Sequence, residues 1–356
     1  MDMPIRSNRK IRARIAAVVG GGVMDSEWLS RLGRVSFLGT LDHHPKIRHI
    51  STRLEHSLSV ANLGLQVAEQ LELDSTNTRQ FVAACLLHDI GHYPFSHAAE
   101  SAFSHRFGAN HHQIGQWIIT GTGPIASWRS LKSYLEDAGI DPNAVWSIID
   151  GTTENTLWAK LSALLRGPIN LDTLDGIMRV ASDFRMRKPL LPERIFVWVD
   201  GFPAICAHEL ASIDEFWQLK NRVYDRVINL PSNILAEARL CDLVKKQLEY
   251  SVLERFLEFD DSTFVQALGE SYSRARLKKH DDKHFELRKR CDRETSLVRI
   301  RKRYFVDRQI GGSKQGLPLH RWGERYRHYK EPAYLMSRGQ QLFLPGVQMT
   351  LESPEI

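Results

Sequence analysis

Apolar residues recur at helical intervals through most of the chain from residue 51 to about 270, which predicts a mainly α-helical body. The clearest stretch is RLEHSLSVANLGLQVAEQLEL, whose apolar positions include Leu54, Leu58, Leu65, Ala68, Leu71 and Leu73. Further helices are expected over 114–120, 131–138, 157–165, 172–184 and 211–259, the last of them interrupted near Pro231.

Two other patterns add to this picture. The segment TRQFVAACLLHDIG is apolar on almost every side, which indicates a buried helix, and Gly91 and Pro94 end it. In RIFVWVDGFPAIC, Val, Ile, Phe and Trp alternate on both sides of Asp200 and Gly201. Alternation around an Asp-Gly pair predicts a β-hairpin, so we expect a small sheet on the helical body.

The charge is uneven along the chain. Residues 271–308 contain 14 Lys or Arg and 6 Asp or Glu, a local net charge of +8, whereas the whole chain carries +6, so the remainder carries −2. A basic segment of this kind suits a polyanionic partner such as nucleic acid, and the alternative is a solvated basic face. We expect three parts: an N-terminal segment 1–50 that packs on the core, a helical core 51–270 and a basic C-terminal appendage 271–356.

Neither a membrane span nor a secretory leader is expected. No apolar run reaches the roughly 18 residues of a transmembrane helix, and the basic N-terminal stretch lacks a secretory apolar region. The four cysteines, Cys85, Cys206, Cys241 and Cys291, are far apart and form no CxxC pair. These features predict a cytoplasmic protein with reduced thiols and no membrane partner.

Candidate chemistry gathers in CLLHDIGHYPFSHAAE, at the end of the buried helix. Imidazole nitrogens and carboxylate oxygens are ligands for divalent transition metals, and the pair His88 and Asp89 can reach a common point beyond the helix end. Further candidates are His56 upstream and Asp172 and Asp175 downstream. The alternative is a buried His–Asp network that holds no metal.

The order of these motifs resembles the HD-domain phosphohydrolase superfamily. The resemblance lies in TRLEHS with His56, LLHDIGHYPFSH with His88 and Asp89, and INLDTLD with Asp172. It is nearest to the deoxynucleoside triphosphate triphosphohydrolase (dGTPase)-like branch, which RLGRVSFLG and NRVYDRV also resemble. The resemblance implies an HD-domain helical bundle with a small hairpin and a basic appendage. It also implies that these four residues bind Mn, Fe, Co or Zn, with Mg on the substrate phosphates.

The same resemblance implies further roles. The catalytic residues would be His92, His112 and Glu100, with Glu100 orienting His112, although the sequence does not decide whether His111 or His112 faces inward. The substrate-binding residues would be Arg53, His97, Tyr224 and Arg222. For Arg53, a structural ion pair is the alternative to a phosphate contact.

The expected pocket walls depart from this branch. Thr173, Gly176 and Val180 stand where a basic, an aromatic and an acidic residue are usual, and Gly176 would leave space near the sugar.

The first function hypothesis is hydrolysis of a dNTP to deoxynucleoside and triphosphate, by a homo-oligomer. The alternatives are an HD phosphohydrolase or phosphodiesterase acting on another nucleotide or on single-stranded nucleic acid, and a nucleotide-sensing regulator without turnover. The segment 271–308 is the expected nucleic-acid contact.

Overall fold

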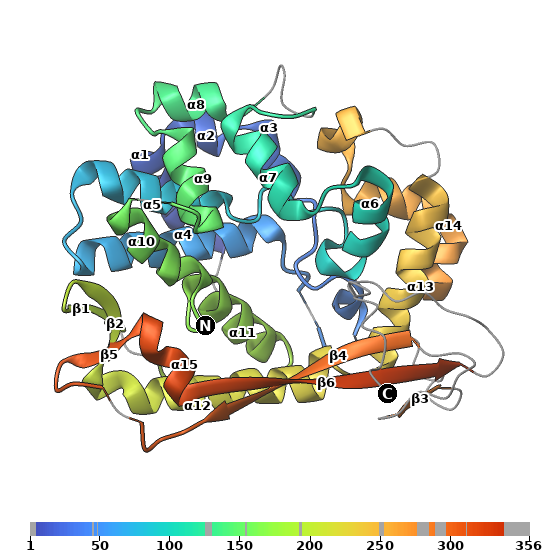
Figure 1. The fold of residues 1–356 in the computed structure, drawn as a ribbon. Coiled ribbons are helices and arrows are strands. Elements are labelled where there is room, and N and C mark those ends of the chain that lie inside the picture. Colours follow the sequence, from blue (N-terminus) through green and yellow to red (C-terminus); the bar gives the residue numbers. More distant parts are fainter. Residues whose placement is uncertain are drawn as a thin grey trace, which may run out of the picture.

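The protein is mainly α-helical, as predicted, and Figure 1 shows helices surrounding the centre with long strands along one side. In a computed structural model, the described residues are 5–44, 46–47, 49–124, 130–153, 155–191, 194–248, 253–275, 285–288, 297–310 and 312–337.

The first helices build one side of the core. They are α1 (Ile5–Val19), α2 (Gly21–Met24), α3 (Glu27–Leu32), η1 (Gly39–His43), α4 (Arg53–Gln70) and α5 (Ser75–Leu87). Thr52 begins α4 in a capping box with Glu55, and Asp74 caps α5, so polar residues fix both helix starts. The helix α1 was not predicted. It packs on α4 and α5 and buries Ile15 and Val19.

The middle of the chain continues as short helices. These are η2 (Ser96–Ala98), α6 (Glu100–Phe107), α7 (His111–Thr120), α8 (Lys132–Asp137), α9 (Pro142–Asp150), α10 (Thr156–Arg166) and α11 (Leu171–Asp183). Three of them end at a glycine in the left-handed region, Gly108, Gly121 and Gly151, a common way to terminate a helix. The predicted helices within 114–120, 131–138, 157–165 and 172–184 are confirmed to within a few residues.

The long helical segment is interrupted where Pro231 predicts it. The chain runs through η3 (Ala207–Glu209) and α12 (Leu210–Val223), then the π-helical turn η4 (Tyr224–Ile228), and resumes as α13 (Pro231–Gln247), η6 (Leu253–Glu258) and α14 (Asp261–Ala275). Pro231 stands at the start of α13, where its missing N–H leaves no hydrogen bond unmade.

Two small antiparallel sheets complete the fold. The predicted hairpin is confirmed: β1 (Phe196–Val199) pairs with β2 (Phe202–Cys206) around Asp200 and Gly201, whose φ angles of 50° and 72° both lie in the left-handed region. The strand β5 (Gly316–Pro318) adds to β2. The second sheet has the order β3 (Phe285–Arg288), β6 (Tyr326–Ser337) and β4 (Leu297–Val306), and η7 (Leu319–Arg321) and α15 (Trp322–Arg325) link β5 to β6.

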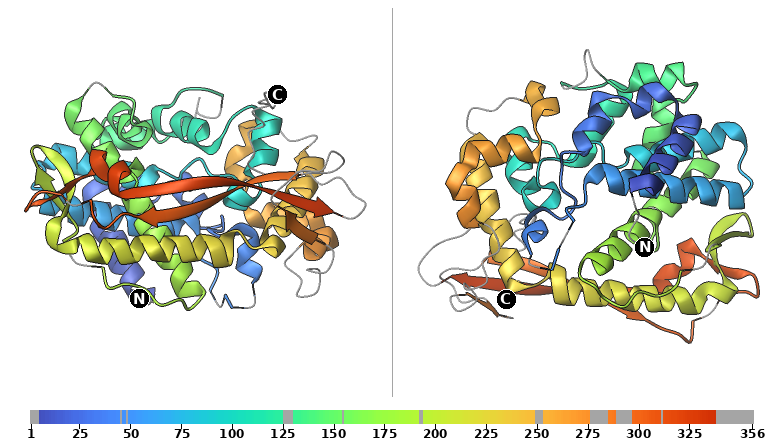
Figure 2. Two further views of the ribbon diagram at one scale, coloured as in Figure 1. Left: turned by 60° about the horizontal axis from the view of Figure 1, so that its bottom comes forward. Right: turned by 180° about the vertical axis from the view of Figure 1, so that it is seen from behind.

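The C-terminal strands lie along α12 (Figure 2). Trp217 of α12 packs on Tyr304 of β4 with ring centroids 5.4 Å apart, and buried Asp214 pairs with Arg325 at 2.6 Å. Residues 271–356 therefore both contact the helical core and add β5 to its hairpin, and the division into three parts stays a prediction.

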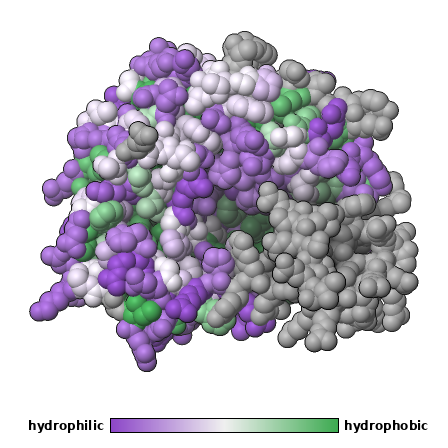
Figure 3. Space-filling model, in the orientation of Figure 1, coloured by the Kyte–Doolittle hydropathy of each residue, from purple (hydrophilic) through white to green (hydrophobic). Residues whose placement is uncertain are grey.

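Several predictions about the chain's surroundings are not decided by the fold. Residues 276–284 and 289–296 of the basic segment lie outside the described residues, so the predicted nucleic-acid contact over 271–308 is untested. None of the helices in the described part of the chain combines the length and apolar character needed to cross a bilayer. On the face in Figure 3, hydrophilic residues cover much of the described surface, and apolar residues show in its central hollow. The homo-oligomer stays a prediction.

Candidate metal centre and active site

Three segments far apart in the sequence bring four ligand-type side chains to one place. His56 lies in the first turn of α4, His88 and Asp89 directly follow α5, and Asp172 lies in the first turn of α11. Both α5 and α11 pack against α4. Asn170 caps α11 through its side-chain oxygen and thereby fixes where Asp172 emerges.

His56, His88 and Asp172 offer ligand atoms that all lie within 4.8 Å of one another, and Asp89 lies beside them. His56 Nε2 lies 3.0 Å from Asp172 Oδ1 and 3.6 Å from Asp89 Oδ2. His88 Nε2 lies 3.5 Å from Asp89 Oδ1 and 3.9 Å from Asp172 Oδ1. Ligands bound about 2.1 Å from a tetrahedral metal are roughly 3.4 Å apart, so these separations fit one cation between them. Both Nε2 atoms are also buried without a hydrogen bond of ordinary geometry.

The other ring nitrogen of each histidine is already engaged. His56 Nδ1 lies 2.7 Å from Asp175 Oδ2, and His88 Nδ1 lies 2.9 Å from the Cys85 carbonyl oxygen. Because a carbonyl or carboxylate oxygen accepts, each Nδ1 carries the hydrogen, and the Nε2 lone pair is directed to the centre. Metal-binding histidines are typically held in this way. The donor set therefore fits a divalent transition metal.

Charge around the centre also favours a cation. Burial opposes a charge on His56, but Asp172 and Asp175 outweigh it and raise its pKa to about 9. Burial likewise favours a neutral Asp89, yet His88 and Arg53 lower its pKa well below the usual range. Without a metal, a proton on His56 partly neutralises the negative charge of the ionised aspartates. A bound cation would neutralise this charge in place of the proton.

Arg53 is a buried partner of Asp89. Its Nη1 donates to Asp89 Oδ2 at 2.6 Å and its Nε donates to Ser96 Oγ at 2.7 Å, with a side chain that is 5 % exposed. The ion pair that was the alternative for Arg53 is therefore present, and its phosphate contact stays a prediction. The physical reason is that a buried guanidinium needs a partner, and Asp89 supplies it.

The loop after the pair His88 and Asp89 has an unusual backbone conformation, which hydrogen bonds from other segments of the chain stabilise. Phe95 and Ser96 have φ angles of 59° and 52°, a region that side-chain-bearing residues rarely adopt. Asp261 of α14 accepts the Phe95 N–H at 2.7 Å, and the Ser96 hydroxyl donates to the Ser36 carbonyl. Segments before and after the HD motif thus stabilise its loop.

The structure corrects the predicted partner of Glu100. Its Oε1 accepts hydrogen bonds from the N–H and the Nδ1 of His111, and its Oε2 accepts from His97 Nδ1 at 3.0 Å. His112 is exposed and does not form this pair. Asn110 caps α7, so His111 and His112 are its first two residues and point about 100° apart; only His111 faces Glu100.

His92 and His111 stack beside the metal centre. Their rings lie 4.2 Å apart at an interplanar angle of 11°, and His92 Nε2 is 3.2 Å from Asp89 Oδ1. Gly91 allows this contact, because a Cβ there would lie 2.1 Å from the His111 carbonyl oxygen. Burial lowers the pKa of His92 well below its usual value, which keeps its ring neutral.

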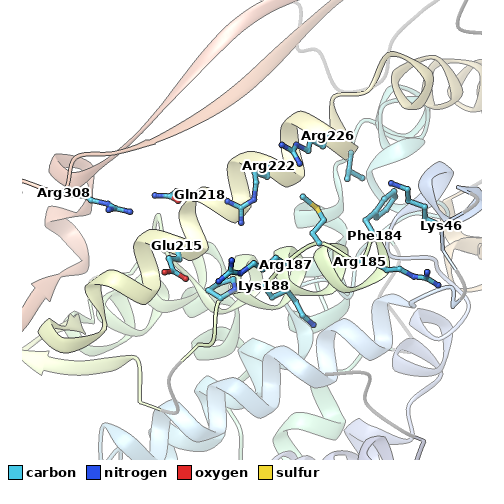
Figure 4. Close-up of a pocket in the computed structure, with 13 residues that line it drawn as sticks. Lys46, Phe184, Arg185, Arg187, Lys188, Glu215, Gln218, Arg222, Arg226 and Arg308 are labelled. Atoms are coloured by element: carbon cyan, nitrogen blue, oxygen red, sulfur yellow. The ribbon is translucent and has the colours of Figure 1, made fainter.

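The other predicted substrate ligands lie in different surroundings. His97 is 65 % exposed and holds the second oxygen of Glu100. Tyr224 packs on Tyr304 with ring centroids 5.0 Å apart. Arg222 lines a separate basic cavity on α12 (Figure 4). The structure therefore places His97 beside Glu100, Tyr224 against Tyr304 and Arg222 at the basic cavity, and their substrate contacts stay predictions.

Two residues near the site were not identified as contributors from the sequence. Arg31 is fully buried and donates to the carbonyl oxygens of His92 and Phe259, each at 2.7 Å, so it supports the HD loop from behind. Phe37 packs on His56 with ring centroids 4.7 Å apart, and its ring lies 3.4 Å from where a Cβ of Gly176 would be. The space expected at Gly176 is thus filled by Phe37. The motif RLGRVSFLG contains both residues but does not reveal these contacts.

Sequence comparison identifies the segment that carries most of this centre. Residues 53–122 match the family model described as HD domain. The chain contains an HD domain. This domain supplies His56, His88 and Asp89, and Asp172 follows it in the sequence.

Curated relatives of this HD-domain chain bear the name deoxyguanosinetriphosphate triphosphohydrolase-like protein, which confirms the resemblance to that branch. The one from Rhodopseudomonas palustris is 45 % identical over 103 residues, or 26 % of this chain and 25 % of the relative. The one from Neorickettsia sennetsu is 27 % identical over 246 residues, or 66 % of this chain and 56 % of the relative. The chain thus spans between a quarter and about half of the length of these two relatives.

Solved structures show the same fold at low identity. A hypothetical protein from Aquifex aeolicus has a TM-score of 0.68 and 18 % identity, and covers 92 % of both chains. A phosphohydrolase from Bacteroides thetaiotaomicron has a TM-score of 0.67 and 16 % identity, covering 89 % of this chain and 94 % of its own. Both solved structures therefore share the fold of nearly the whole chain.

Proposed function

We propose that this chain is a metal-dependent phosphohydrolase that acts on a nucleotide, with dNTPs as the first candidate substrates. The observation that carries the proposal is the grouping of His56, His88 and Asp172 beside Asp89, with both histidine Nε2 atoms turned to the centre by their Nδ1 partners. The names of the curated relatives support a nucleotide substrate.

These four residues would hold the metal. When bound, a divalent cation in such a site lowers the pKa of a coordinated water and polarises a phosphoryl oxygen. The protein supplies the geometry. Asp175 fixes the ring of His56, and Arg53 orients Asp89 and keeps it ionised. Asp172 is 47 % exposed, so the centre is open to a substrate on that side.

The pair of Glu100 and His111 supplies proton transfer. In the proposed reaction water adds to phosphorus, the bond from phosphorus to the leaving oxygen breaks, and that oxygen takes up a proton. Glu100 engages His111 Nδ1 and leaves His111 Nε2 to give this proton. Although burial raises the pKa of Glu100, His111 and His97 lower it below the usual range, so Glu100 stays ionised. With a dNTP, the products are a deoxynucleoside and triphosphate.

A phosphodiester is the second candidate substrate, and the charge of the site favours it. Arg53 is occupied by Asp89, and Arg179 by Asp175 at 3.0 Å. Thr173 stands where the related branch has a basic residue. A triphosphate brings several negative charges to this site, whereas each phosphodiester linkage brings one. A phosphodiester therefore needs fewer unpaired Lys or Arg side chains to neutralise its charge.

A substrate panel tests the proposal. The full chain with Mn²⁺ or Co²⁺ is incubated with dNTPs, NTPs, cyclic dinucleotides and short single-stranded oligonucleotides, and products are separated by chromatography. We expect turnover of at least one class, lost in the double variant His88→Ala/Asp89→Ala. Asp242→Asn, which removes an exposed carboxylate paired with Lys246, should keep it. Full activity in the double variant would show that the centre is not the active site, and no turnover by the wild type would favour a sensor.

A further inference from the structure

Asp261, the first residue of α14, joins two segments that border the metal centre. Its Oδ2 accepts the N–H of Ser36 at 3.0 Å, and its Oδ1 accepts the N–H of Phe95 at 2.7 Å. The helix α14 packs against α13 and lies apart from α5 and α11 (Figures 1 and 2). One carboxylate from a remote helix therefore connects the segment before α4 with the loop after α5.

The contact with Phe95 stabilises a strained backbone. Phe95 and Ser96 have φ angles of 59° and 52°, and this left-handed conformation is unfavourable for residues that carry a side chain, so the surrounding structure has to hold it. The Ser96 N–H donates to the Tyr93 carbonyl oxygen at 3.0 Å within the loop itself. The Phe95 N–H, in contrast, finds its acceptor in α14. The conformation of this loop therefore depends on Asp261.

Ser96 connects the loop to a proposed metal ligand. Its hydroxyl accepts from Arg53 Nε at 2.7 Å and donates to the Ser36 carbonyl oxygen. Arg53 Nη1 in turn donates to Asp89 Oδ2 at 2.6 Å. Ser96, Arg53 and Asp89 are all buried, so a displaced partner is not readily replaced by water. A shift of the loop would therefore reach Asp89 through two hydrogen bonds.

The contact with Ser36 aligns a second segment, which covers His56. Ser36 forms an isolated β-bridge with Thr52, and the next residue, Phe37, donates its N–H to the Ser51 carbonyl oxygen at 2.9 Å. Thr52 caps α4, the helix that carries His56, and the Phe37 ring packs on the His56 ring with centroids 4.7 Å apart. The same carboxylate thus borders both sides of the centre.

We propose that Asp261 is a positioning residue, which fixes the orientation of Asp89 and thereby sets the affinity of the centre for its metal. This role rests on the proposed function, because it concerns the same metal centre. Both partners of Asp261 are N–H donors, so both of its oxygens have to accept. A carboxylate accepts at both oxygens, whereas asparagine offers one oxygen and one NH₂ group, which would face an N–H and lose that contact.

Metal affinity tests this role without any measurement of turnover. Metal-stripped full chains, wild type and Asp261→Asn, are titrated with Mn²⁺, and the visible absorption of the Co²⁺-loaded chains reports the ligand geometry. Residues that hold a metal ligand typically contribute about 10–100-fold to affinity, so we expect Asp261→Asn to bind Mn²⁺ about tenfold more weakly and to change the Co²⁺ spectrum. In a Ser96→Ala background, Asp261→Asn should have little further effect, because its action passes through that hydroxyl.

Asp260→Asn is the matched control. The Asp260 carboxylate accepts the Thr263 N–H at 3.0 Å at the start of α14 and pairs with Arg34 at 2.6 Å, and neither partner belongs to the loop after α5. This variant should lower the free energy of unfolding in urea but leave the Mn²⁺ affinity and the Co²⁺ spectrum unchanged, which separates stability from positioning. Asp261→Ser, which leaves room for a water, takes the place of Asp261→Asn if that variant does not fold, and it should weaken Mn²⁺ binding in the same direction.

The positioning role and the proposed function fail in different ways. A wild-type chain that binds neither Mn²⁺ nor Co²⁺ would overturn both. If the wild type binds Mn²⁺, three results would each overturn the role of Asp261 alone: equal affinity of the Asp261 variant, an equal loss in Asp260→Asn, or full additivity with Ser96→Ala.

Discussion

Replacing Asp175 by asparagine should weaken metal binding, although Asp175 is not itself one of the proposed metal ligands. The Asp175 carboxylate lies 2.7 Å from His56 Nδ1, 2.5 Å from the Ser59 hydroxyl and 3.0 Å from Arg179 Nε. Burial opposes its charge, but His56 and Arg179 lower its pKa to about 2, so it is ionised under all ordinary conditions. An asparagine side chain would keep the shape, lose the charge and make His56 Nε2 a weaker ligand. Loss of such a partner typically costs about 10–100-fold in metal affinity, or roughly 1.4–2.7 kcal/mol.

The assay is titration of metal-stripped chain with Mn²⁺, with free Mn²⁺ followed by its electron paramagnetic resonance signal. Ser59→Ala removes only one hydrogen bond to Asp175 and should cost less than about tenfold. Asp242→Asn removes an exposed carboxylate elsewhere and should change nothing. In a His56→Ala background, Asp175→Asn should have little further effect, because its action passes through that ring. Equal affinity of Asp175→Asn and wild type, or full additivity with His56→Ala, would refute this account of the centre.

Other variants test the surroundings of the site. Glu100→Gln should lower kcat by roughly 10²–10⁴-fold at unchanged metal content, whereas His112→Ala should lower it far less, as steady-state kinetics and metal analysis can show. Burial and Asp261 raise the pKa of Asp42 to about 8, so its carboxyl binds a proton more tightly in the folded than in the unfolded chain. Wild type should therefore lose stability relative to Asp42→Asn as the pH rises from about 4 to about 8, measured by urea unfolding. Arg31→Met removes the donor to two carbonyl oxygens, one buried and one partly buried, and should lower the free energy of unfolding by roughly 2–5 kcal/mol, measured in the same way.

Local signals were sufficient to predict much of the fold. Helical spacing, the break near Pro231 and the Asp200-Gly201 turn each act within a few residues, and the structure confirms them. The helix α1 was missed because its apolar residues are interrupted by arginines, and its burial depends on contacts with α4 and α5. The pairing of β5 with β2 spans more than 100 residues, and no local pattern indicates it.

In the candidate site, too, some features could be predicted from the sequence and others depend on contacts that the sequence does not reveal. The resemblance to the HD-domain superfamily implies a common site for His56, His88, Asp89 and Asp172, and the structure brings these side chains together. The partner of Glu100 was predicted wrongly, because adjacent residues on a helix face different directions and the helix start at Asn110 decides which one turns inward. The role of Arg53 depended on whether Asp89 would occupy it, which only the three-dimensional arrangement shows.

The walls of the pocket explain why a common type of metal centre does not by itself identify the substrate. The aromatic ring beside the centre comes from Phe37 of the N-terminal segment, and it fills the space next to Gly176 of α11. Arg53 and Arg179 flank this ring at 4.8 and 5.8 Å, and both are already paired with aspartates. A substrate at the metal therefore meets an apolar ring and histidines before it meets a free cation. Such an environment should discriminate by shape and by total charge, so a panel that compares triphosphates with phosphodiesters tests this expectation.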